Sequence, residues 1–365
     1  MRGVGQTTSY DVRRPKSLST EADITLLFTV PFDYPLFVED EILGSEEAIT
    51  LGSRQGRLEF PKDAQPSKGS GGLLPPTSAG KAIGAHFEDG WGVKRESEPS
   101  IEINAILVAV PVRAELSFDL PGNQVGGEGV QVVLEEVSVW FESFCHWLWV
   151  LTAQALDPSN PDPKVLHRRS SNVIFAASSS RRFSLPASGS PRLTIRMDAH
   201  GPTSERLVDR RVLALSVSRA GTSTPPITWE LLASARMAGR RGDARRALID
   251  AGTTAEGALS KVLSLTPNHQ LTLGRLVTEA LGRNIGVPSD ARAALVQPRN
   301  DAVHRGHLSG INVGRGIEIA EELIALVDPD FIRGSSLRPV NRPQRHDIVI
   351  IQPGSSTSSS NKEPH

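Results

Sequence analysis

The residues from Pro298 to Gly306, P-R-N-D-A-V-H-R-G, place three side chains with complementary chemistry close together. Arg299 carries a permanent positive charge, Asn300 a carboxamide and His304 an imidazole, a group that ordinarily changes charge near neutral pH. A fixed cation beside a proton-transfer group is suited to cleaving a phosphodiester without a metal ion. The alternative is a basic helix end that carries no chemistry, so the surrounding elements decide between the two.

Each of these side chains has a task that RNA cleavage needs. Neutral His304 would take the proton from a ribose 2′-hydroxyl, or protonated His304 would give one to the leaving 5′-oxygen. Arg299 would stabilise charge on the phosphoryl oxygens, and Asn300 would orient a phosphate or the imidazole. Because the nucleophile belongs to the RNA, this chemistry predicts neither a metal nor a cofactor. DNA, which lacks the 2′-hydroxyl, would be spared.

Helical spacing limits how these side chains can meet. Arg299 and His304 are about 140° apart around an ideal helix, whereas Asn300 and His304 share a face. The Arg299 and His304 side chains can reach one phosphate only if the arginine curls round the helix, or if two copies of the helix face each other across a twofold axis. We therefore expect a homodimer. If Pro298 begins a helical segment, Arg299 and Asn300 lie in a first turn, whose free backbone N–H groups favour an anion.

The elements that must position this segment are helices. After Thr222–Pro226 the hydrophobic pattern has a helical period, and short connections predict an antiparallel bundle of five helices over residues 226–330. The predicted helices are Trp229–Arg240; one capped by Asp243 that ends near Ser264; Gln270–Arg283; one capped by Ser289 that continues, or restarts at Pro298, to His304–Arg305 before Gly306; and Val313–Val327 after Asn312.

The stretch Trp229–Val327 resembles HEPN domains, the small helical bundles of many prokaryotic toxins and defence ribonucleases. The resemblance lies in R-R-G-D-A-R-R-A-L-I-D-A-G-T-T-A-E-G-A-L at 240–259, L-T-L-G-R-L at 271–276 and A-L-V-Q-P-R-N-D-A-V-H-R-G at 294–306. The family signature of arginine, a polar residue, three or more residues and histidine corresponds to Arg299, Asn300 and His304. The resemblance implies a dimer with this motif at its interface, and RNA cleavage without metal in active members.

Two further residues are candidates for supporting roles. A glutamate at the place of Glu256 often borders the site in the family, and the alternative is a carboxylate at the edge of the apolar stripe that pairs with an arginine. Arg305 could add a phosphate contact, although an arginine that faces its own helix dipole explains it equally well. His307 follows the helix end and is expected to be a solvated loop residue. The remaining histidines show no metal-ligand spacing.

Residues 23–225 are predicted to form an α+β module, mainly of antiparallel strands with one long helix, and neither a family nor a catalytic constellation is recognised in it. The helix, Val130–Leu156, carries closely spaced aromatic residues. They could suggest base stacking, but their helical spacing favours a core-facing helix. The predicted strands are Ile24–Val30, ended by Pro31; Ile101–Val112; Ala114–Leu120; Val173–Ala177; Leu193–Met197; and Arg211–Val217.

Composition supports a cytoplasmic protein of two domains, with tails at 1–22 and 331–365 expected to be disordered. The chain has 365 residues, one cysteine, no secretion signal and no apolar stretch that could span a membrane. Residues 164–225 hold 11 Lys/Arg against 3 Asp/Glu, whereas residues 1–163 hold 12 against 24. This basic block either approaches a polyanion or neutralises the acidic part within one folded unit.

Together these features predict a metal-independent endoribonuclease that acts as a toxin or antiphage defence effector. The N-terminal module would sense a trigger or restrain the nuclease, with an antitoxin or trigger protein as a partner besides RNA. The alternatives are a non-catalytic bundle that binds RNA or nucleotides or pairs subunits, and a protein whose N-terminal module performs the function.

Overall fold

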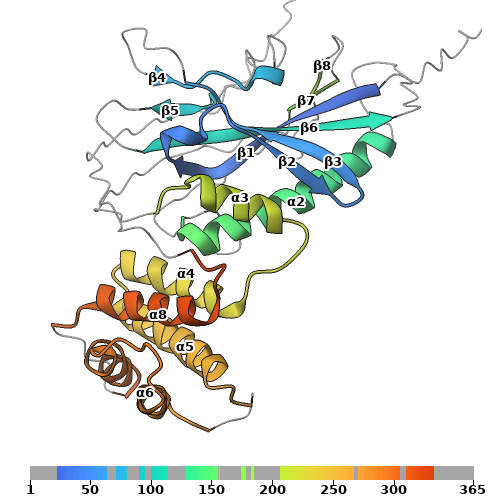
Figure 1. The fold of residues 1–365 in the computed structure, drawn as a ribbon. Coiled ribbons are helices and arrows are strands. Elements are labelled where there is room, and N and C mark those ends of the chain that lie inside the picture. The colour runs from blue at the N-terminus through green and yellow to red at the C-terminus, as the bar shows by residue number, and fades with distance from the viewer. Residues whose placement is uncertain are drawn as a thin grey trace, which may run out of the picture.

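The computed structural model describes residues 23–63, 71–79, 90–94, 100–113, 128–154, 156, 174–177, 182–184, 206–266, 270–304 and 310–332. In these residues an antiparallel sheet is followed by a helical C-terminal region (Figure 1). Helices α2 (Glu128–Thr152) and α3 (Arg210–Arg219) run beneath the sheet, between it and the later helices (Figure 1). The expected order, an α+β region followed by a helical region, is confirmed.

The strands along the sheet have the order β2-β3-β6-β1-β7-β8, and each neighbouring pair is antiparallel. β4 pairs with β5, which in turn pairs with β6. The strands are β1 (Asp23–Val38), β2 (Glu46–Leu51), β3 (Arg54–Glu59), β4 (Gly71–Gly72), β5 (Gly92–Lys94), β6 (Ile101–Arg113), β7 (Ile174–Ala177) and β8 (Arg182–Ser184), with short 3-10 turns η1 (Asp40–Ile42) and η2 (Thr77–Ala79).

The central strand β1 is longer than its sequence suggests. The predicted stop at Pro31 is wrong, because Pro31 pairs with Ala105 and the strand continues to Val38. Proline has no N–H to donate to the ladder, and the chain accommodates this with a shift of register between Pro31 and Leu36. The interruption therefore bends the strand without ending it.

Helix α2 packs its aromatic face into the core, as its spacing predicts. Trp140 and Phe144 are each at most 1% exposed, and their rings stack at a centroid distance of 5.0 Å. The whole predicted stripe is buried: Val133, Val137, Trp140, Phe144, Leu148 and Leu151. These buried aromatic rings serve packing and leave no face for base stacking.

The segment predicted as a strand at Arg211–Val217 is instead α3. Its apolar residues alternate loosely, which suggested a strand, but Val212, Leu213, Ser216 and Val217 are the buried ones, at helical spacing. The Asp209 side chain accepts a hydrogen bond from the Val212 N–H and caps the helix. Burial on one helical face and this cap favour a helix over the strand that the alternation predicts.

The later helices follow the predicted boundaries closely. Asp243 is an N-cap, as expected, and accepts a hydrogen bond from the Arg246 N–H; Asn312, expected to precede the last helix, is its N-cap and accepts from the Arg315 N–H. Ser289 makes no cap hydrogen bond among the described residues, and the helix after it begins at Ala291. The helical elements are α4 (Ile227–Arg240), α5 (Ala244–Val262), α6 (Leu273–Gly282), the π-helical η3 (Arg292–Val296), α7 (Gln297–His304) and α8 (Val313–Val327).

One continuous core joins the sheet region to the helical region. Trp229 of α4 meets Trp147 of α2 edge to face at 6.0 Å and Phe331 at 5.1 Å. Buried Gln154 bonds both backbone groups of Phe37 and the Arg206 carbonyl. Arg206 in turn donates to the Ile332 carbonyl, and burial lowers the pKa of its guanidinium.

Several predicted features lie outside the described residues. They are the strands Ala114–Leu120 and Leu193–Met197, the tail at 1–22, Arg305, Gly306, His307 and the tail beyond Ile332. No helix in the described part of the chain is long and apolar enough to cross a bilayer.

Candidate functional site

The motif Arg299–Asn300–His304 lies on α7, which packs against α5 and continues from η3, the segment that packs against α8. Arg315 of α8 binds both carboxylate oxygens of Asp290, just before η3, through its Nε and Nη2 at 2.7 and 2.8 Å. Arg315 also bonds Glu318 and Glu322 on its own helix. The start of the helix that leads through η3 into α7 is therefore fastened to α8 by a charged network.

The electrostatics of this network favour its charged form. The hydrogen bond from Arg315 lowers the pKa of the Asp290 carboxyl below its ordinary value of 3.8. The same pair, together with Glu322, raises the pKa of the Arg315 guanidinium. Asp290 is therefore ionised at neutral pH and keeps its partner.

Pro298 lies inside a continuous helix, so it does not begin a new one. Residues 291–304 are helical throughout, and the Gln297 N–H bonds the Arg292 carbonyl five residues back in a π turn. A proline would clash with the carbonyl four residues before it in a regular α-helix, and the wider π turn relieves that crowding. The expectation that Arg299 and Asn300 lie in a first turn with free N–H groups is therefore wrong.

Arg299 crosses α5 and pairs with Glu256. Its Nη2 lies 3.3 Å from Glu256 Oε1, and both side chains are about one-quarter exposed, at 24% and 28%. Its Nη1 donates to Asn300 Oδ1 at 3.4 Å. Its Nε is buried without a hydrogen-bond partner among the described residues.

The crossing depends on Gly252. A Cβ at this position would lie 2.6 Å from Arg299 Cγ, closer than a normal contact allows. Gly252 precedes Glu256 by one helical turn, so α5 offers a gap and then a carboxylate along the path of the arginine. Gly252 was not predicted from the sequence, although a glycine one turn before a candidate acidic residue could have indicated the gap.

His304 is exposed in the last turn of α7, on the same face as Asn300. It makes no hydrogen bond or ion pair with any residue that the structure describes. The structure thus brings Arg299, Asn300 and Glu256 into contact, while His304 projects separately and Arg305 lies outside the described residues. Within one chain, no contact joins the imidazole to the guanidinium.

A second arginine contact between α5 and α7 comes from Arg245 of α5, which reaches the end of α7. Arg245 Nε donates to the Ala302 carbonyl at 3.0 Å, whereas Arg299 on α7 meets Gly252 and Glu256 farther along α5. The two helices therefore run antiparallel along this seam. Arg245 was also missed, although the spacing of Arg245, Ile249, Gly252 and Glu256 marks one helical face in the sequence.

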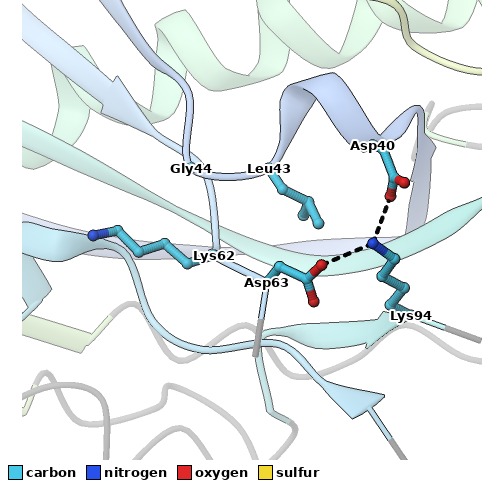
Figure 2. Close-up of a pocket in the computed structure, with 6 residues that line it drawn as sticks. All are labelled: Asp40, Leu43, Gly44, Lys62, Asp63 and Lys94. Atoms are coloured by element: carbon cyan, nitrogen blue, oxygen red, sulfur yellow. Dashed lines mark hydrogen bonds and ion pairs between the residues drawn. The ribbon is translucent and has the colours of Figure 1, made fainter. Parts of the chain in front are cut away.

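A separate hollow of about 360 Å³ opens on the sheet region (Figure 2). Lys94 Nζ bridges Asp40 at 3.0 Å and Asp63 at 2.8 Å, and these bonds raise the pKa of its ammonium. Lys62 extends away from this triad (Figure 2). Lys94 therefore offsets the charge of both carboxylates that line the hollow.

Within the described ranges, no three His, Cys, Asp or Glu side chains gather as the ligands of a metal would. No known protein family, functionally characterised protein or solved structure matches this chain.

Proposed function

We propose that the chain is a metal-independent endoribonuclease with Arg299, Asn300 and His304 at its active site. The observation that carries the proposal is the anchoring of Arg299 by Glu256 across Gly252, on the same short helix as an exposed His304 that pairs with no described residue. A cation held in a fixed position suits transition-state stabilisation, and a solvent-accessible imidazole suits proton transfer.

The cleavage step uses only groups of the protein and the RNA. A neutral His304 takes the proton of a ribose 2′-hydroxyl, and the resulting alkoxide attacks the adjacent phosphorus. The bond from phosphorus to the 5′-oxygen breaks, and a protonated imidazole supplies the proton of the new 5′-hydroxyl. Arg299 offsets charge on the non-bridging oxygens, and the other product is a 2′,3′-cyclic phosphate.

Two copies complete the site most simply. Because Arg299 and His304 are about 140° apart on one helix and share no contact, a twofold pair of α7 helices would set Arg299 against His304 of the partner subunit. Within such a site, one His304 takes the proton of the 2′-hydroxyl and then, once protonated, gives it to the leaving 5′-oxygen. We therefore propose a homodimer with composite sites.

The resemblance of residues 226–330 to HEPN bundles also supports a proposal about the biological role of the protein. A toxin or antiphage effector of this class cleaves cellular or invading RNA, and residues 23–225 would act as its sensing or restraining part. The continuous core between the two regions supports such coupling, because a change of packing in one region would alter the packing of the other. The partners would be RNA, a second copy, and an antitoxin or trigger protein.

One observation favours a second candidate, a non-catalytic bundle that binds RNA or nucleotides or pairs subunits. The Arg299 guanidinium already has a carboxylate partner, and its Nε is buried, as expected for an arginine that fastens α7 to α5. In that case Arg299 contributes to packing and His304 is an ordinary surface residue.

Expression in cells separates the two candidates. Cells induced for the wild type should stop growing and lose intact RNA, whereas cells with His304→Ala at equal protein level should grow normally. Immunoblotting checks that the wild type and His304→Ala are present at the same level. Unimpaired growth and intact RNA with the wild type would favour the non-catalytic bundle.

A further inference from the structure

Two arginine contacts join α5 to α7, and they differ in whether a carboxylate offsets the charge of the arginine. At one end Glu256 offsets the charge of Arg299. At the other end Arg245 donates to a neutral carbonyl, that of Ala302, and forms no ion pair with a residue that the structure describes. Among the described residues of this seam, Arg245 is therefore the arginine whose positive charge has no carboxylate partner, at the end where α7 reaches His304.

Arg245 is exposed, and its single hydrogen bond to a described residue uses Nε. The two terminal nitrogens of its guanidinium keep their donors for another acceptor. Its neighbour Arg246 differs, because Arg246 Nε lies 3.5 Å from Asp250 and its Nη2 bonds Ser234 at 3.5 Å. Arg245 is therefore held in place by one hydrogen bond while its terminal nitrogens can still donate, whereas Arg246 is already paired.

The bond to Ala302 also fixes where the free donors lie. Ala302 is two residues before His304, so the guanidinium is bound to the same final turn of α7 as the imidazole. Ala302 and His304 are about 160° apart around the helix. Arg245 and His304 therefore flank the end of α7 from different sides and would contact different phosphates of one strand.

We infer that Arg245 binds a phosphate of the RNA backbone next to the one that is cleaved, an inference that rests on the proposed function. A guanidinium that is pre-positioned by one hydrogen bond loses less freedom when it binds an anion. Contacts with phosphate oxygens fix the register of a strand without reading its sequence. Arg245 would thus position the scissile phosphate at His304 without taking part in proton transfer.

Arg245→Gln tests this inference while keeping the protein bond. The glutamine Nε2 stands as many bonds from the backbone as the arginine Nε, so it can still donate to Ala302, and only the charged end is lost. Arg246→Gln is the matched control, with the same change of charge at the neighbouring position. Thermal unfolding of both variants checks that α7 remains in place.

The binding probe is a fluorescent single-stranded RNA with 2′-O-methyl groups, which lacks the nucleophile and stays intact. Arg245→Gln should weaken its binding about tenfold and reduce the slope of log K against log salt by about 0.7, the loss of one phosphate contact. Arg246→Gln should bind within about twofold of wild type. Cleavage of unmodified RNA by Arg245→Gln should fall mainly through a higher KM.

The outcomes separate this inference from the proposed function. Equal binding and equal salt slope for Arg245→Gln and Arg246→Gln would overturn the role of Arg245, even if wild-type protein cleaves RNA. Binding that depends on Arg245 without any cleavage would support the phosphate contact and contradict the nuclease. Absence of RNA binding by the wild type would overturn both.

Discussion

Arg299 has two neighbours on α5 that limit the position of its guanidinium, a gap at Gly252 and a carboxylate at Glu256. Both side chains of the ion pair are partly exposed, so the pair contributes no more than about 1 kcal/mol to stability. Its larger effect is to restrict the arginine to one path across α5. At the scale of the residue, the arrangement serves orientation more than stability.

Gly252→Ala tests this orientation. Alanine within a helix is about 1 kcal/mol more favourable than glycine, but its Cβ would displace Arg299 from its path. We expect an unfolding midpoint close to that of the wild type and RNA cleavage reduced at least about tenfold.

Gly282→Ala is the matched control, because no atom lies within 4 Å of a Cβ added there. It should leave cleavage unchanged. Full activity of Gly252→Ala would show that the position of Arg299 does not matter for the reaction.

At the scale of elements, α7 depends on contacts that its own sequence does not contain. It is a short helix that follows a π segment; α5 holds it through Arg299 and Arg245, and α8 holds the start of that π segment through Arg315 and Asp290. Isolated helices of this length are not stable in water. The site geometry is therefore a property of the packed bundle.

Asp290→Asn probes the fastening of η3 and α7 to α8. Because the folded pKa of Asp290 is lowered by Arg315, the ion pair stabilises the fold at neutral pH and loses that contribution as the pH falls below about 3.8. We expect a lower unfolding midpoint for Asp290→Asn at pH 7 and a difference that narrows toward zero in more acidic buffer.

Ser289→Ala, an exposed neighbour without a cap hydrogen bond among the described residues, provides the comparison. Its midpoint should follow the wild type at every pH. A destabilisation by Asp290→Asn that stays constant down to pH 2.5 would contradict an electrostatic role for this carboxylate.

Sequence patterns predict these elements to different degrees. The caps at Asp243 and Asn312 and the stripe of α2 were predictable because each depends on local spacing. The strand assigned to Arg211–Val217 was wrong, because its burial is decided by distant elements packed around α3. The gap at Gly252 is a fit between α5 and α7, which spacing along one helix cannot reveal. The π turn before Pro298 was missed because helical spacing assumes a regular α-helix.

At the scale of the whole molecule, the sheet region and the helical region share one core. Trp229, which is 3% exposed, lies between Trp147 of α2 and Phe331 at the end of the described chain. This arrangement predicts that the two regions unfold together, despite their different architectures.

Trp229→Ala should lower the free energy of unfolding by about 3–5 kcal/mol in a single transition. Denaturant unfolding followed by circular dichroism and by tryptophan fluorescence should give coincident curves. Ile227→Ala, at a position 66% exposed in the same turn, should change stability by less than about 0.5 kcal/mol. Two separate transitions, with only one shifted by Trp229→Ala, would contradict a shared core.

The composite site predicts complementation between inactive variants. In a dimer of Arg299→Ala with His304→Ala, one site carries both substitutions and the other carries neither. Random pairing in co-expressed protein makes about half of the dimers mixed, so about one-quarter of wild-type sites should be intact. RNA cleavage near this level would support the dimer, whereas activity no higher than that of each variant alone would exclude a site shared in this way.

The most direct test of the proposed nuclease activity is cleavage of single-stranded RNA by the purified protein in excess EDTA, with the product ends identified by mass spectrometry. We predict 2′,3′-cyclic phosphate and 5′-hydroxyl ends with the wild type, and a rate at least about 100-fold lower with His304→Ala. Cleavage that needs Mg²⁺, cleavage that persists in His304→Ala, or no cleavage by the wild type would contradict the account.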